Sequence, residues 1–215
     1  MCKLIPIEYH GKKYPANIKV EIEEQAAHFD KISLKPSKKY SLHTEYSAGV
    51  RKLNSLLMQD LKSIKKAEKK GIPKLWFSKE WSREFFIFLS RLIGEENHPP
   101  EIIEIHPPFT DYCNSIYDFL DKYIPFELRI REKYPETKIA IENRCGTMYS
   151  GGKFLLSKND SLLNLSNILD KNKSKLKIML DIPQLFSAHK INLRKITKEE
   201  IIDVLKPIEE IIHNI

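Results

Sequence analysis

The sequence contains little cysteine and has no long apolar run. Its cysteines are Cys2, Cys113 and Cys145, and none of them forms a CxxC or CxxxH pair. This odd, scattered set of thiols argues against a disulfide scaffold and a structural zinc finger, and it indicates a reducing, cytoplasmic location. No apolar run approaches the ~18–20 residues of a membrane-spanning helix. Pro6 and Glu8 break the N-terminal stretch too early for a signal peptide. We therefore expect a cytoplasmic protein with no membrane partner.

Glycine is also scarce, with seven residues among 215. No glycine-rich fingerprint follows an early strand, which leaves a dinucleotide-binding fold without support. Basic residues outnumber acidic ones by 36 to 29, for a net charge of +7. They are mostly interleaved with acids, and no alternation of aromatic and basic residues typical of single-strand binding occurs. The charge is compatible with a phosphorylated partner or DNA and requires neither.

What the sequence does contain is an alternation of short apolar strands and longer amphipathic helices. Strands begin roughly every 28–39 residues, which is the size of a βαβ unit and implies a parallel sheet. The clearest strands are expected at 40–43, 102–106, 138–142 and 177–181, a weaker one at 74–77, and a further one at either 18–22 or 31–34. Helices are expected over 48–70, 79–93, 111–133, 159–170 and 197–213. Ser78 and Thr197 are predicted N-caps, the second with Glu200 in a capping box.

We predict a single α/β domain over residues 1–215, built as a parallel (β/α) barrel of the TIM type. The chain is shorter than the ~250 residues of a typical eight-stranded barrel. We therefore expect an incomplete barrel of about five to six β/α units that lacks the last strands. Missing strands would leave an open sheet edge, which a second copy of the chain or a second subunit would cover.

Each of the four clearest strands ends on a side chain that can bind a metal ion. These residues are His43, His106, Glu142 and Asp181. In a parallel barrel the carboxyl ends of all strands meet at one face, so these side chains would point into one mouth. Imidazole and carboxylate groups together suit Zn²⁺, Mn²⁺ or Fe²⁺. The alternative is that the four are independent caps or core hydrogen-bonding residues.

Further polar residues follow these strand ends. Arg144 lies two residues after Glu142 and can anchor either that carboxylate or an anionic substrate. Gln184 would lie just beyond the fourth strand, with His189 in the loop that follows as a substrate contact or a surface residue. Residues 146–154 resemble a phosphate-binding loop, but the spacing is one residue too long and the Mg²⁺-binding Ser or Thr is absent. We expect there either a mobile loop over the mouth, hinged at 151–152 with Lys153 reaching the substrate, or a plain turn.

These residues resemble a known family. The strand that ends in His43, the sequence IEIHPP around His106, IAIENR at 139–144 and IMLDIPQLF at 178–186 are similar to the xylose isomerase-like TIM-barrel superfamily. That group includes sugar phosphate isomerases and epimerases and the endonuclease IV relatives. The resemblance implies that His43, His106, Glu142 and Asp181 bind one or more divalent metals, here Zn, Mn or Mg. It also implies Glu142 and Asp181 as catalytic residues.

The sequence departs from the family in two ways. In the endonuclease branch a ligand His stands three residues after the Asp, where this chain has Gln184, an amide that is a poor zinc ligand. We therefore expect no full trinuclear zinc cluster. The family's later strands supply further His, Asp and Glu ligands, and the sequence given ends at Ile215, after the helix that follows the Asp181 strand.

Two classes of function follow. The first is a metal-dependent barrel enzyme that acts on a sugar or sugar phosphate, as an isomerase or epimerase, with an endonuclease IV-like nuclease acting on DNA as the alternative. The second is a non-catalytic, truncated barrel that needs a partner. The positive charge favours DNA slightly, whereas Gln184 favours the sugar enzymes or an inactive form.

Overall fold

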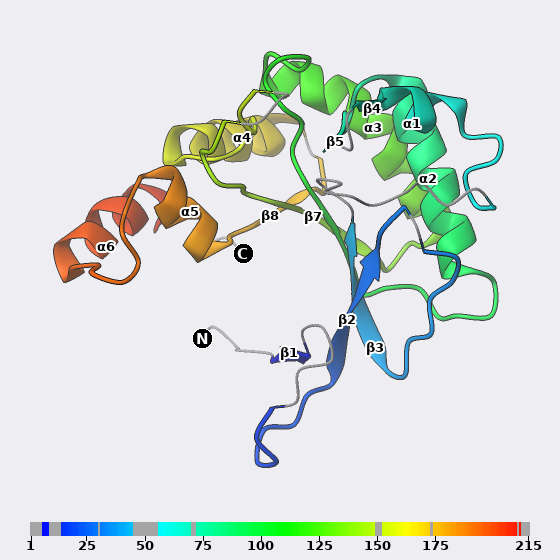
Figure 1. Cartoon of the computed structure of the whole chain (residues 1–215), viewed down its shortest axis with the longest axis horizontal. Coiled ribbons are helices and arrows are strands. Elements are labelled where there is room, and N and C mark those ends of the chain that lie inside the picture. Colours follow the sequence, from blue (N-terminus) through cyan, green and yellow to red (C-terminus); the bar gives the residue numbers. More distant parts are fainter. Residues whose placement is uncertain are drawn as a thin grey trace.

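A six-stranded parallel sheet forms the centre of the computed structural model (Figure 1). The structure describes residues 6–8, 14–29, 31–44, 56–69, 72–148, 152–172, 174–209 and 211. The strands of the sheet are β1 (Ile7–Glu8), β2 (Ile22–Ala27), β3 (Lys39–Thr44), β6 (Ile102–Ile105), β7 (Lys138–Glu142) and β8 (Lys177–Met179). Their order in space, β1-β2-β3-β6-β7-β8, is their order along the chain. A doubly wound sheet reverses its strand order at a switch point, and this sheet has no such reversal.

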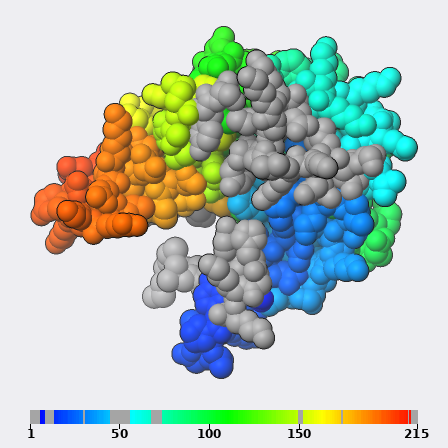
Figure 2. Space-filling model, viewed as in Figure 1, coloured from blue at the N-terminus to red at the C-terminus, as the bar shows by residue number. Residues whose placement is uncertain are grey.

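The helices follow the later strands. They are α1 (Lys62–Ala67), α2 (Lys79–Ile93), α3 (Ile116–Lys133), α4 (Asn159–Asn172), α5 (Ile182–Ala188) and α6 (Lys198–Leu205), followed by a short 3₁₀ turn at Lys206–Ile208. Figure 1 shows α1 to α4 along one side of the curved sheet, and Figure 2 shows α5 and α6 projecting as the orange lobe. The small antiparallel pair of β4 (Glu68–Lys69) and β5 (Ile72–Pro73) is separate from the sheet. The predicted α/β class with a parallel sheet is confirmed as a partial β/α fold.

Two features distinguish the fold from a regular series of β/α units. The described parts of the connections β1–β2 and β2–β3, residues 14–21, 28–29 and 31–38, contain no helix. Within the described residues, the sheet is open, with β1 at one edge and β8 at the other. The strand count therefore matches the expected five to six units, but in the described part of the chain helices follow only β3, β6, β7 and β8 of the sheet.

Alternating residues of the central strands face the helices. In the register of the sheet, Leu42 lies beside Ile103, and Ile103 lies beside Ile139. Ile141 lies in the same way beside Ile178. These side chains are buried in one apolar core with residues of α2, α3 and α4. Since successive side chains of a strand point to opposite faces, the residues between them face away from the helices.

A cluster of aromatic rings fills the core around Trp76. The Trp76 ring lies 5.1–5.7 Å, centroid to centroid, from five other rings: Trp81, Phe85, Phe119, Tyr123 and Phe126. Trp76 has a φ of 56°, and residues 75–76 form a turn, so the strand predicted at 74–77 is wrong. A left-handed conformation is costly for a residue with a large side chain. The burial of the indole, and its hydrogen bond from Nε1 to the His106 carbonyl at 2.8 Å, offset that cost.

Other sequence predictions have mixed outcomes. The helix expected at 79–93 is confirmed with its N-cap Ser78, as is the capping box of Thr197 and Glu200. The strand at 138–142 is also confirmed. The helix expected over 48–70 is wrong in its described part: 56–60 form turns and 68–69 a strand, and only Lys62–Ala67 is helical. Neither 18–22 nor 31–34 is a strand; β2 begins only at Ile22.

The aromatic cluster can be tested with Phe126→Ala. Phe126 is fully buried and stacks on Phe85 at 5.4 Å. Its truncation leaves a cavity among rigid rings, so we expect the free energy of unfolding to fall by about 3–5 kcal/mol. The control is Leu128→Ala on the same helix, where the side chain is 58% exposed and the change stays within about 0.5 kcal/mol. Urea unfolding followed by tryptophan fluorescence measures both, because both tryptophans belong to this cluster.

Candidate metal centre

Three ligand atoms converge at the carboxyl ends of neighbouring strands β3, β6 and β7. His106 Nε2 lies 3.1 Å from His43 Nε2 and 2.6 Å from Glu142 Oε2. The remaining pair, His43 Nε2 and Glu142 Oε2, is 3.9 Å apart. The two imidazole rings are stacked, with centroids 4.9 Å apart. The structure therefore brings together three of the four ligands that the strand ends predict.

The three atoms have the spacing of ligands around a single ion. Nitrogen and oxygen ligands about 2.0–2.1 Å from a tetrahedral Zn²⁺ lie roughly 3.3 Å from each other. The observed separations of 2.6–3.9 Å bracket that value. Two histidines with one carboxylate is the donor set of catalytic zinc sites that keep an open position, and of facial-triad iron sites. This buried cluster can hold a divalent metal ion.

The cluster is mostly buried, and His43 is the most exposed of its three side chains. The side chains of His43, His106 and Glu142 are 18%, 0% and 8% exposed. Arg144 is buried as well, and its Nη1 donates to Glu142 Oε2 at 3.3 Å. Its guanidinium lies 5.7 Å from the centre of the Phe154 ring. Arg144 therefore restrains the Glu142 carboxylate through a hydrogen bond within the protein interior.

Two further carboxylates approach the other nitrogen of His43. Glu24 Oε1 lies 3.5 Å and Glu104 Oε2 lies 3.7 Å from His43 Nδ1. Ser41 donates a hydrogen bond from its hydroxyl to Glu104 Oε1. The sequence analysis missed both carboxylates. Glu104 could have been found from its spacing, because it lies two residues before His106 and so on the same face of the strand.

These charges shift the pKa values of the cluster. Burial lowers the pKa of His43, but the hydrogen bond that the imidazole donates to Glu24 and the charges of Glu104, Glu24 and Glu142 outweigh it, so the pKa is raised. Burial raises the pKa of Glu104, with further contributions from the charges of Glu24 and Glu142, and the Ser41 hydrogen bond and the His43 charge only partly oppose this. The region thus concentrates negative charge around one imidazole, an environment that attracts a cation.

Asp181, the fourth predicted ligand, lies beside Glu142 but outside the ligand clusters that the described residues form. Its carboxylate caps α5, with Oδ1 accepting from Gln184 N at 2.9 Å. Asn143 holds its backbone through two hydrogen bonds, of 2.8 and 3.0 Å. Burial, together with a hydrogen bond to Glu142 and its charge, raises the pKa of Asp181 to about 6. Asp181 therefore lies next to the centre as a capping carboxylate.

The predicted substrate residues take different positions. Gln184 lies in the first turn of α5, and His189, predicted in a loop, is the half-buried C-cap of that helix. Lys153 is exposed, while its backbone pairs with Thr110. Residue 151 of the proposed hinge lies outside the described residues. The described part of that loop is anchored, since the Phe154 ring stacks on Phe109 at 4.2 Å.

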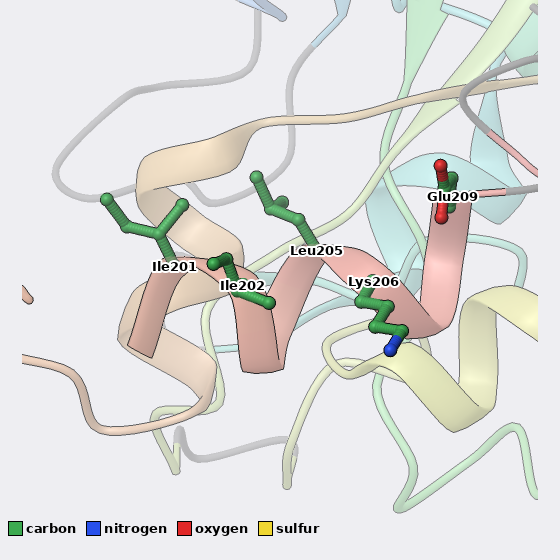
Figure 3. Close-up of a pocket in the computed structure, with 5 residues that line it drawn as sticks. All are labelled: Ile201, Ile202, Leu205, Lys206 and Glu209. Atoms are coloured by element: carbon green, nitrogen blue, oxygen red, sulfur yellow. The ribbon is translucent and has the colours of Figure 1, made fainter. Parts of the chain in front are cut away.

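A groove on α6 lies apart from this centre (Figure 3). It has a volume of about 400 Å³ and is lined by Ile201, Ile202, Leu205, Lys206 and Glu209. These residues come from α6 and the turn directly after it. With a single carboxylate and no imidazole or thiol, the groove does not have the ligands of a metal site.

Comparison of the chain with protein-family models, curated proteins and solved structures gave no match. Among the described residues, no helix has both the length and the apolar character needed to cross a membrane.

Metal binding should stabilise the fold. An ion that binds only the folded chain adds about 2.7 kcal/mol when its free concentration is 100 times Kd. We expect the wild type to show this gain with Zn²⁺ or Mn²⁺, and Glu142→Gln and His106→Ala to lose it. The exposed Glu132→Gln on α3 is the matched control and should keep the full gain. Urea unfolding with and without each metal measures the effect, and an equal gain in all four proteins would contradict the site.

Proposed function

We propose that this protein is a divalent-metal-dependent enzyme that acts on a sugar or sugar phosphate, in the manner of an isomerase or epimerase on a partial TIM-type barrel. The observation that carries the proposal is the convergence of His43 Nε2, His106 Nε2 and Glu142 Oε2. In parallel β/α folds, active sites lie at the carboxyl edge of the strands, which is where these atoms meet. The resemblance of the strand-end motifs to the xylose isomerase-like superfamily supports the same reading.

The size and burial of the centre favour a small substrate. His106 and Glu142 are almost inaccessible, and only His43 is partly open to solvent. Three protein ligands leave at least one coordination position for a substrate oxygen. A hydroxyl or carbonyl oxygen of a sugar is small enough to enter such a site. The net charge of +7 helps to attract a phosphorylated sugar.

The residues around the centre have distinct roles. His43, His106 and Glu142 would hold the ion, and Arg144 fixes the Glu142 carboxylate. A bound divalent ion supplies Lewis acidity that polarises a substrate carbonyl or hydroxyl oxygen. Asp181 lies beside Glu142 and is the carboxylate placed to take a proton from a substrate carbon and return it to the neighbouring one.

The decisive experiment assays purified protein on a panel of aldoses, ketoses and their phosphates, with Zn²⁺, Mn²⁺ or Mg²⁺ added in turn. We expect metal-dependent interconversion of at least one pair. Asp181→Asn retains a side chain that can cap α5, so it should still bind metal while kcat falls by about 10²–10⁴-fold. Glu132→Gln serves as the control with unchanged activity.

Two outcomes would contradict the proposal. Cleavage of DNA that contains an abasic site, with no sugar converted, would indicate the nuclease. Metal binding with neither activity would indicate a non-catalytic module.

A further inference from the structure

The two nitrogens of His43 face different surroundings. Nε2 points to His106 and Glu142, whereas Nδ1 points to Glu24 and Glu104. We propose that Glu104 and Glu24 are positioning residues that hold the Nδ1–H of His43 and thereby present its Nε2 lone pair to the metal centre. This inference rests on the proposed metal centre and adds the groups that set its geometry.

Glu104 is held by one hydrogen bond to its side chain and by another to its backbone. The Ser41 hydroxyl donates to Oε1, which leaves Oε2 as the oxygen that faces His43. Thr44 donates from Oγ1 to the Glu104 carbonyl at 2.7 Å and so ties the end of β3 to β6. Both donors are buried, as is the Glu104 side chain. The carboxylate is therefore fixed by β3, the strand that also carries the imidazole it would orient.

The proton count of the cluster supports the same tautomer. Ionised carboxylates only accept hydrogen bonds, so the nitrogen of a neutral imidazole that faces Glu24 and Glu104 is the one that carries hydrogen. His43 Nε2 is then an acceptor. In the metal-free chain, one hydrogen on His106 Nε2 would serve both its 2.6 Å contact with Glu142 and its 3.1 Å contact with His43, and an ion bound at the centre would take the place of that hydrogen. With the other His43 tautomer, two hydrogens would meet between the rings.

This arrangement is typical of metal-binding histidines, which donate the ring N–H that does not face the metal to a carboxylate or carbonyl. Such partners fix the ring and raise its basicity, and their loss weakens metal binding by about 10–100-fold. A different use of the same residues is a second ion held between Glu24, Nδ1 of His43 and Glu104, whose ligand atoms also lie close together. A second ion would require Nδ1 of His43 to have no hydrogen. The number of ions bound per chain therefore distinguishes a second metal site from the positioning role.

The test titrates the full chain with Zn²⁺ and with Mn²⁺ by calorimetry at pH 8, for the wild type, Glu104→Gln, Glu24→Gln and the control Glu132→Gln. We expect one ion per chain, a Kd raised about 10–100-fold by Glu24→Gln and by Glu104→Gln, and no change in the control. Ser41→Ala is the milder variant and should weaken binding in the same direction if Glu104→Gln does not fold.

A second readout does not depend on metal. In ¹⁵N-labelled, metal-free protein, NMR reports the tautomer of His43, which we expect to be Nδ1–H in the wild type and shifted toward Nε2–H in Glu104→Gln. An Nε2–H wild type, an unchanged Kd in both Gln variants, or a second ion lost in Glu104→Gln would each overturn the inference. If the wild type binds no metal, the proposed function is wrong. The NMR measurement of the His43 tautomer still tests the positioning role of Glu104 in that case.

Discussion

The register of the parallel sheet is the constraint on which the rest of this structure depends. Because paired residues of parallel strands point to the same face, Leu42, Ile103 and Ile139 form one apolar row against the helices. The residues between them necessarily face the other way, and among them are His43, Glu104 and Glu142. A slip of one residue in any strand would place charged groups in the aromatic core and remove them from the centre. Fold and site are therefore specified by the same register.

Burying polar side chains on the face of the sheet opposite the helices is unfavourable in free energy. Contacts among these side chains reduce that cost. Buried charges destabilise a fold unless they are paired or hydrogen-bonded. Here Glu142 accepts from Arg144 and contacts His106, while Glu104 accepts from Ser41. The aromatic cluster on the opposite face supplies the apolar burial that such a polar layer cannot. His106 connects the two layers, since its ring belongs to the centre and its carbonyl accepts from the Trp76 indole.

The sequence predicts the parts of the fold whose periodicity is strong and local. The amphipathic helix at 79–93 and the strand at 138–142 carry complete patterns, and His43, His106 and Glu142 follow from the ends of their strands. What it does not predict depends on tertiary contacts. β2 reads IEEQAA, which has little apolar character, so neither the strand nor Glu24 is recognisable. The Trp76 segment looks like a strand because its left-handed turn is stabilised by tertiary contacts, among them the Phe126 ring and the His106 carbonyl.

Asp181 shows how local geometry limits what a motif implies. β8 ends at Met179, and the Pro183 that follows favours the first turn of a helix, so α5 begins at once. A residue directly before a helix uses its side chain as the cap, and Asp181 does so. Its carboxylate is thus partly committed to the backbone, which makes it a weaker ligand than the three residues on β3, at the end of β6 and on β7. The same commitment fixes it beside Glu142. If the centre holds an ion, a carboxylate beside it would suit proton transfer better than one that coordinates it, because a carboxylate bound to a cation is a weaker base.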